Sequence, residues 1–143
     1  MNAVDTNVLV YFVDVQEPVK QAVAISLLQS LGRSNKRVVL PWQVGGEFLC
    51  CLRRWENAGH IKSNDTQRHL SQLESMFTFV FPTQTILASS LQLSSRYQLS
   101  HWDSMLLAAC IDAGIDTLYS EDLSAGMTYD SVTVINPFAP TVA

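Results

Sequence analysis

Five carboxylates stand beside short apolar runs or at the starts of helical patterns, and they are Asp5, Glu47, Asp103, Glu121 and Asp122. Two like charges about 4 Å apart repel by about 4 kcal/mol at an effective dielectric constant of about 20. Acids gathered in one place therefore retain protons or bind a cation. Oxygen ligands favour Mg²⁺ or Mn²⁺ over zinc, and such an ion can activate water against a phosphate. The chemistry that these residues indicate is phosphodiester hydrolysis.

Short apolar segments alternate with helical patterns along the whole chain. We expect strands at 2–4, 37–41, 78–81, 117–119 and 132–135. We expect helices at 8–12, 18–31, 43–57, 65–76, 83–97 and 100–113. This alternation predicts parallel strands with helices on both faces of a sheet. The predicted fold is α/β, a three-layer α/β/α sandwich with a central five-stranded, mainly parallel sheet.

The composition is that of one folded domain over residues 1–143. Hydrophobic residues make up 48% of the chain and charged residues 15%, which excludes a disordered protein. The net charge of −4 confines any nucleic-acid contact to a local patch. No apolar run approaches the roughly 18 residues of a membrane span, and the first residues do not form a signal sequence. We expect a cytoplasmic protein with no membrane partner, whose three cysteines are small core residues.

The expected topology would bring the five acids to one edge of the sheet. Each connecting helix runs antiparallel to its strands and so begins at the carboxyl edge, where open α/β folds place their sites. Each acid also has an ordinary structural interpretation. Asp5 could cap a helix, Asp103 could complete a capping box with Ser100, Glu121 and Asp122 could form a turn, and Glu47 could be solvated. It is the convergence of the set that favours a site.

Five stretches match the pattern of a known family in its order. They are Val4–Leu9, Val44–Glu47, Leu99–Ala109, Leu118–Leu123 and Ile135–Phe138. This set resembles the PIN-domain family, and in particular the small VapC-type toxins of toxin–antitoxin pairs. The resemblance spans nearly the whole chain, and the ordered set is more specific than any one stretch.

The resemblance implies a PIN-like fold and a metal-dependent endoribonuclease that binds Mg²⁺ or Mn²⁺ through an acidic quartet. The implied catalytic metal ligands are Asp5, Glu47, Asp103 and Asp122. The residues expected to orient these ligands or contact phosphate are Thr6, Asn7, Ser120 and Glu121. Asp122 fits the family's Ser/Thr-x-Asp pattern through Ser120 and is preferred to Glu121, which could act as a stand-in. The implied partners are an RNA substrate, a small antitoxin protein and a second copy of the chain.

Other residues indicate how RNA could be held. Trp42 and Trp55 could stack on bases, although Trp55 falls on an apolar helix face. Basic clusters at 33–37 and 53–54 could hold phosphates, although solvated helix ends are an equal interpretation. Gly45 and Gly46 indicate a helix start or a close approach of the backbone, because glycine inside a helix costs about 1 kcal/mol relative to alanine.

Four other functions make different demands on these residues. A haloacid-dehalogenase-like phosphatase needs Asp-x-Asp, and here the second position is Asn7. A phosphate-receiver domain needs a late lysine, and no lysine occurs after Lys62. A non-catalytic PIN-like module that binds RNA or protein remains as the alternative of another class. A PIN nuclease of RNA processing, not a toxin, is the alternative within the same class.

Overall fold

The computed structural model describes residues 1–140 and contains one sheet of six strands. The strands are β1 (Asn2–Val4), β2 (Val38–Pro41), β3 (Thr78–Val80), β4 (Thr117–Tyr119), β5 (Thr128–Tyr129) and β6 (Val132–Ile135). Their order across the sheet is β3-β2-β1-β4-β6-β5. All neighbours pair in parallel except β5, which pairs antiparallel with β6. The α/β prediction with a mainly parallel sheet is confirmed.

The prediction of five strands was wrong by one. The additional strand β5 has only two residues, and it forms a hairpin with β6 in which Thr128 lies opposite Thr133. Asp130 makes the turn with a φ of 52°, in the left-handed region. A two-residue strand carries no alternation of apolar and polar positions, so periodicity could not detect it.

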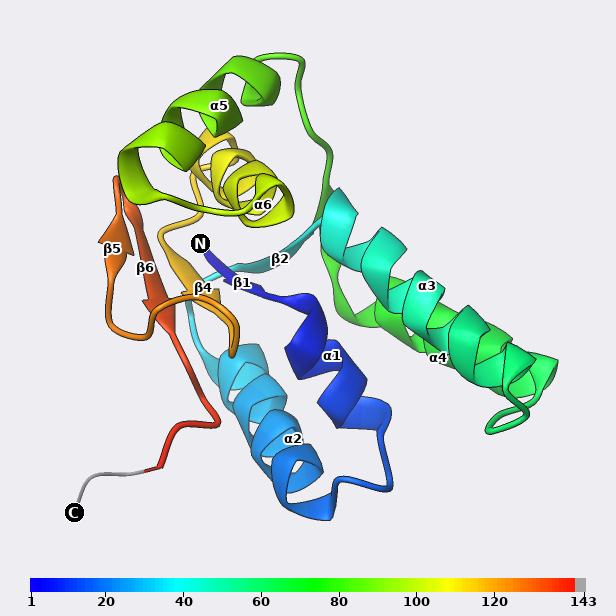
Figure 1. Ribbon diagram of the computed structural model, residues 1–143. Coiled ribbons are helices and arrows are strands. Elements are labelled where there is room, and N and C mark those ends of the chain that lie inside the picture. Colours follow the sequence, from blue (N-terminus) through cyan, green and yellow to red (C-terminus); the bar gives the residue numbers. More distant parts are fainter. Residues whose placement is uncertain (141–143) are drawn as a thin grey trace.

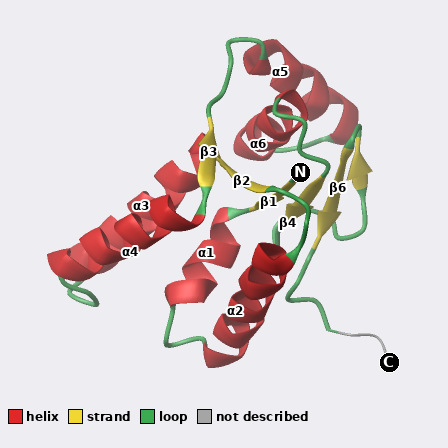
Figure 2. Cartoon of the chain, turned by 180° about the vertical axis from the view of Figure 1, so that it is seen from behind, coloured by secondary structure: helices red, strands yellow, loops and turns green. Residues whose placement is uncertain are grey.

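Six helices connect the strands, and they are α1 (Thr6–Val13), α2 (Pro18–Arg33), α3 (Trp42–Asn57), α4 (Ser63–Met76), α5 (Ile86–Tyr97) and α6 (His101–Asp112). Helices α5 and α6 cover one face of the sheet, and α1 and α2 cover the other (Figure 1). The pair α3 and α4 extends outward from the side of β3, as the reverse view shows (Figure 2). The three-layer arrangement therefore carries a helical hairpin at one edge. Within residues 1–140, no helix is both long enough and apolar enough to cross a membrane.

The core lies between the sheet and its two helical layers. Central strand residues such as Val4, Val39 and Leu118 are completely buried. Strands covered on both faces need apolar side chains at successive positions, which explains the unbroken apolar runs in the sequence. Helix starts are set locally: Asp5 accepts a hydrogen bond from the Thr6 amide at the start of α1, and Ser100 accepts one from the Asp103 amide at the start of α6.

Gly45 marks a close approach between α3 and the sheet. A Cβ atom at Gly45 would lie 2.6 Å from Cε1 of Phe79, whereas a Cβ atom at Gly46 would have no neighbour within 4 Å. We expect Gly45→Ala to lower the free energy of unfolding by about 1–3 kcal/mol through overpacking. Gly46→Ala should raise it by up to about 1 kcal/mol, because alanine favours the helix. Urea unfolding of the two variants measures both effects, and equal midpoints would contradict the close approach.

Candidate active site

Asp5 is a buried carboxylate at the end of β1 and the start of α1. Its side chain belongs to a residue that is only 5% exposed. Oδ1 accepts a hydrogen bond from the Thr6 amide at 2.7 Å, and Oδ2 accepts one from Ser120 Oγ at 2.7 Å. The pKa of Asp5 is raised to about 6, mainly by burial. The two hydrogen bonds act to lower the pKa, and the charges of Glu47 and Asp122 act to raise it. Three acids therefore influence one another across this edge of the sheet.

Glu47 reaches the same place from α3. Its Oε2 accepts a hydrogen bond from Thr6 Oγ1 at 2.6 Å, so Thr6 contacts Asp5 through its amide and Glu47 through its hydroxyl. Its Oε1 accepts a hydrogen bond from Gln43 Nε2 at 2.8 Å. Gln43 stands four residues earlier on the same face of the helix, and the same nitrogen donates to the Trp102 carbonyl at 3.2 Å. Helix α3 is thereby joined to the starts of both α1 and α6.

The segment after β4 supplies Asp122. The completely buried Ser120 donates its hydroxyl proton to Asp5, and its oxygen accepts the Asp122 amide at 3.1 Å. Asn7 Nδ2 donates to Asp122 Oδ2 at 3.2 Å, and Asn7 Oδ1 accepts the Glu121 amide at 3.2 Å. Asn7 and Ser120 therefore hold the turn so that the Asp122 carboxylate lies beside the start of α1.

Glu121 is engaged elsewhere. Its Oε1 accepts a hydrogen bond from Lys20 Nζ at 2.5 Å, and the Lys20 ammonium also donates to the Tyr11 hydroxyl at 3.0 Å. Partial burial acts to raise the pKa of Glu121, but the hydrogen bonds from Lys20 and Tyr11 outweigh it and lower the pKa. A carboxylate already neutralised by an ammonium group is a poor ligand for a second cation. The two neighbouring acids therefore have different surroundings: Glu121 pairs with Lys20, and Asp122 accepts from Asn7 beside the start of α1.

Asp103 lies in the first turn of α6, one residue after the carbonyl that accepts from Gln43. Its amide donates to Ser100 Oγ at 3.3 Å, which supplies half of the expected capping box. Within residues 1–140, no hydrogen bond joins the Asp103 side chain to the other three acids. The contact of Gln43 with the Trp102 carbonyl ties the start of α6, which carries Asp103, to α3, whereas the charges that act on Asp5 are those of Glu47 and Asp122.

The donor chemistry of this edge fits a hard divalent cation. Asp5, Glu47 and Asp122 offer only oxygen, and their hydrogen-bond donors Thr6, Ser120, Asn7 and Gln43 are neutral, so the negative charge is uncompensated. The pKa of Asp5 is raised mainly by burial, and the charges of Glu47 and Asp122 add to the rise. In the described part of the chain, no three His, Cys, Asp or Glu side chains already stand in a metal-binding arrangement. The acids therefore supply the oxygen donors and the negative charge that a divalent cation needs. Within the described residues they do not stand in a complete metal-binding arrangement.

The basic cluster at 33–37 lies away from this edge. Lys36 pairs with Asp116, and the cluster at 33–37 leads into the amino end of β2, whereas the acids lie at the carboxyl end of the strands.

The prediction that all three cysteines are core residues holds for the buried Cys110 but is wrong for Cys50, which is exposed on α3. The residues Arg53 and Arg54 line a shallow hollow of about 450 Å³ on that same exposed face of α3.

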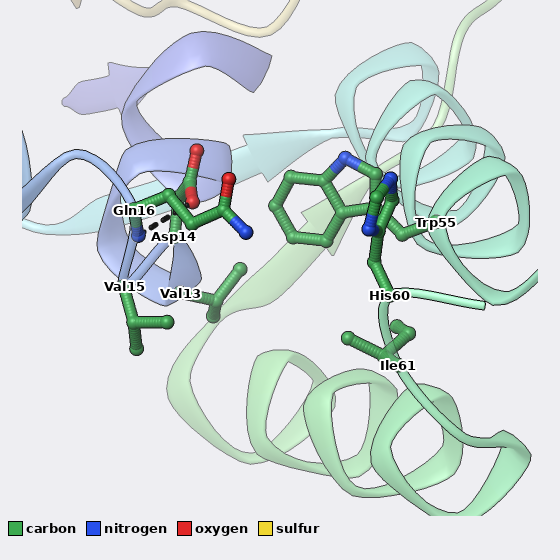
Figure 3. A pocket seen from close by; sticks show the side chains of 7 residues that line it. All are labelled: Val13, Asp14, Val15, Gln16, Trp55, His60 and Ile61. Atoms are coloured by element: carbon green, nitrogen blue, oxygen red, sulfur yellow. Dashed lines mark hydrogen bonds between the residues drawn. The ribbon is translucent and has the colours of Figure 1, made fainter. Parts of the chain in front are cut away.

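A cavity of about 200 Å³ lies at the other end of α1 and α3 (Figure 3). The segment 13–16 forms one wall, and Trp55 and His60 face it from the opposite side. Glu47 and Trp55 are eight residues apart on one helix, which separates them by about 12 Å along its axis. Trp55 therefore lies outside the acidic edge.

Sequence reasoning did not single out Gln43 or the Trp102 carbonyl that it binds. The spacing of four residues between Gln43 and Glu47 was the available signal for the first contact. The second contact joins residues 59 positions apart, and no local pattern announces it.

Comparisons with known proteins agree with this fold. A model of the PIN domain matches residues 3–125. A search of curated protein sequences gave no match. A toxin–antitoxin complex from Klebsiella pneumoniae contains a chain that superimposes with a TM-score of 0.66 at 18% identity, covering 96% of this chain and 98% of that one.

Two further solved structures are similar. VapC20 of Mycobacterium tuberculosis, a toxin that cleaves the sarcin–ricin loop, gives a TM-score of 0.62 at 19% identity and covers 85% of this chain and 90% of that one. VapBC2 of Rickettsia felis, bound to a DNA fragment from its promoter, gives 0.68 at 12% identity and covers 93% and 96%. At these identities the likeness concerns the fold.

Proposed function

The chain belongs to the PIN domain family, and from this premise we propose that it is a Mg²⁺- or Mn²⁺-dependent endoribonuclease acting as the toxin of a toxin–antitoxin pair. The observation that carries the proposal is the buried Asp5, which shares one edge of the sheet with Glu47 and Asp122. Asp5 also caps α1, but the mutual repulsion of three uncompensated acids opposes folding. Binding a cation gives their proximity a purpose.

In this proposal Asp5, Glu47, Asp103 and Asp122 hold the metal ion. A divalent cation held there supplies Lewis-acid activation of the phosphodiester and of the attacking water. Thr6 and Ser120 orient Asp5 and Glu47 by donating hydrogen bonds, and Asn7 orients Asp122 in the same way. Such outer partners fix the direction of each carboxylate before the ion arrives.

Two features support RNA as the substrate. Arg54 lies seven residues after Glu47, so it lies near the same helical face and about 10 Å along the axis, a distance that a few nucleotides of a single strand can span. VapC20, one of the similar structures, is described as cleaving the sarcin–ricin loop, which is an RNA target. We propose that Arg53 and Arg54 hold the backbone of a single-stranded region.

The proposed partners are a small antitoxin protein and a second copy of the chain. The similar structures from Klebsiella pneumoniae and Rickettsia felis are described as a toxin–antitoxin complex and as VapBC2. Val15 and Val19 are more than three-quarters exposed, which leaves apolar surface near the start of α2 for a partner. Co-purification with the product of an adjacent small reading frame would support the toxin role. A nuclease of RNA processing would not form that complex.

The test of the function is hydrolysis of single-stranded RNA by the purified protein. We expect cleavage with Mg²⁺ or Mn²⁺, none after chelation, and recovery when the ion is restored. An RNA-binding module without activity would bind the same RNA and leave it intact under every condition, and that result would overturn the proposal.

Asp122 and Glu121 form a matched pair for testing the site. We expect Asp122→Asn to lower the rate of cleavage by more than about 100-fold, the upper end of what losing an outer-shell partner costs. Glu121→Gln breaks a partly exposed ion pair with Lys20, worth about 0–1 kcal/mol of stability, and leaves cleavage nearly unchanged. Initial rates at saturating Mn²⁺ measure both. A larger loss of cleavage in Glu121→Gln than in Asp122→Asn would show that Glu121, and not Asp122, is the metal ligand.

A further inference from the structure

A cavity of about 220 Å³ opens beside the acidic edge, between the start of α3, the segment after β3 and the start of α6. Trp42, Phe81 and Trp102 are its large aromatic walls, and Gln43 lies in its lining. Pockets that hold drug-sized ligands run to about 300–1,000 Å³. This cavity is smaller, and its size suits a single ring system.

The aromatic walls are exposed in an unusual way. Trp42 is 54% exposed, Phe81 67% and Trp102 61%, and these are the aromatic members of the large exposed apolar side chains in residues 1–140. All three line this one cavity. The rings of Trp42 and Phe81 lie 5.2 Å apart between centroids with planes tilted by 35°, so they support each other without being covered. Parts of these rings therefore remain exposed to solvent, which costs free energy because apolar surface is more stable when it is buried.

The cavity is continuous with the acidic edge through Gln43. That side chain lines the cavity and its Nε2 donates both to Glu47 Oε1 and to the Trp102 carbonyl. Trp102 is also the residue immediately before Asp103. A group seated between the aromatic rings would therefore adjoin a phosphate presented to the acids.

The occupant that this setting favours is an unpaired nucleobase. The neighbouring acids repel phosphates, so charge alone does not hold a polynucleotide at this edge. Stacking on aromatic rings supplies about 1–3 kcal/mol per base and does not depend on charge. The exposed aliphatic side chains Leu87 and Leu91 line a neighbouring hollow between α5 and α6, whose lining within the described residues contains no Trp, Tyr or Phe, so the exposed Trp and Phe rings gather in the cavity next to the acids.

We propose that the cavity walled by Trp42, Phe81 and Trp102 is a base-stacking subsite, which holds one unpaired nucleobase of a single-stranded RNA next to the phosphate acted on by the acids. This inference rests on the proposed ribonuclease function and adds to it a requirement for single-stranded substrate. A base in a duplex is stacked on its own neighbours and cannot enter the cavity without being unpaired.

Binding is measured first with the full chain, after chelation, so that no cleavage occurs. The RNA is a fluorescently labelled single-stranded oligoribonucleotide, compared with the same strand in a duplex. We expect Trp42→Ala, Phe81→Ala and Trp102→Ala each to weaken binding of the single strand by about 5- to 100-fold. Trp42→Phe should restore most of the affinity. Leu91→Ala is the matched control, since it removes an exposed apolar side chain from the neighbouring hollow.

Salt dependence separates stacking from charge. Loss of an aromatic wall should weaken binding equally at low and high salt and leave the slope against salt unchanged, whereas replacing Arg54 with glutamine should reduce the slope. Thermal melting of each variant shows whether it is folded, and the Phe81 change, at the most exposed wall, is the one least able to disturb the fold.

Cleavage then locates the base. In an RNA that the protein cuts, an abasic ribose is placed in turn at each nucleotide beside the cut. Removing the base at one of these positions should lower kcat/KM of the wild type by the same factor as Trp42→Ala does on the intact RNA. On that abasic RNA, Trp42→Ala should cause no further loss of kcat/KM. If the loss from the abasic ribose and the loss from Trp42→Ala instead multiply when the two changes are combined, the subsite is overturned.

The remaining outcomes distinguish this subsite from the proposed function. If the wild type cleaves and the aromatic variants bind and cleave like it, the subsite is overturned and the function stands. If no RNA is cleaved but the aromatic variants still lose affinity for the single strand, the proposed function fails, whereas stacking of an unpaired base in the cavity is supported. If Trp42→Ala and Leu91→Ala both turn a dimer into a monomer in sedimentation while RNA affinity is unchanged, the cavity is an interface between copies and the subsite is overturned.

Discussion

Replacing Asp5 with asparagine is expected to abolish both RNA cleavage and any growth arrest caused by the protein. Asparagine has the same shape, and its Oδ1 can still accept the Thr6 amide at the start of α1. It carries no charge, so the cation loses its most buried ligand. We expect a fall of about 10³-fold or more in the rate, which corresponds to about 4 kcal/mol of transition-state stabilisation.

The measurement combines cleavage of single-stranded RNA in Mn²⁺ with growth after induced expression. Glu74→Gln is the matched control, because it removes one negative charge from an exposed position on α4, and it should cleave and arrest growth like the wild type. Arrest that persists with Asp5→Asn would show that the acid cluster is not the source of toxicity.

The same substitution is expected to stabilise the metal-free protein at neutral and alkaline pH. The pKa of Asp5 is raised by burial from its ordinary value of 3.8 to about 6, so the folded protein binds this proton more tightly than the unfolded chain does. The contribution to stability is fully present below about pH 4 and is lost as pH rises through about 6. Above that pH the free energy of unfolding of the wild type is therefore lower by about 3 kcal/mol, whereas the uncharged asparagine of the variant causes no such decrease.

Urea unfolding in chelator from pH 4 to pH 8 tests this expectation. The difference in free energy of unfolding between Asp5→Asn and the wild type should move in favour of the variant by about 3 kcal/mol across that range. Adding Mn²⁺ at pH 8 should reduce the advantage, because the ion stabilises the protein that binds it. A difference that is constant with pH would mean that Asp5 does not titrate in this way.

The order of elements follows from local properties of the sequence. Successive apolar residues such as Ala3 and Val4, or Val39 and Leu40, are completely buried because both faces of a central parallel strand are covered, and helical spacing marks the segments between the strands. Chain direction then brings the residues after β1 and β4 to one edge. The prediction that Asp5 and Asp122 would meet there needed no knowledge of side-chain contacts, and the match of the PIN domain to residues 3–125 agrees with the resemblance in the motifs.

Contacts between distant residues were decided only by the tertiary structure. Glu121 and Asp122 are chemically alike and adjacent, and only the position of Lys20 on α2 directs one of them away from the acidic edge. The same holds for Gln43 and the Trp102 carbonyl. The wall formed by Trp42 and Phe81 arises from two elements whose rotation is set by packing over the whole core. Periodicity and chain direction are properties of a segment, whereas the partner of a side chain depends on how segments are turned against one another, and that is the part the sequence alone did not determine.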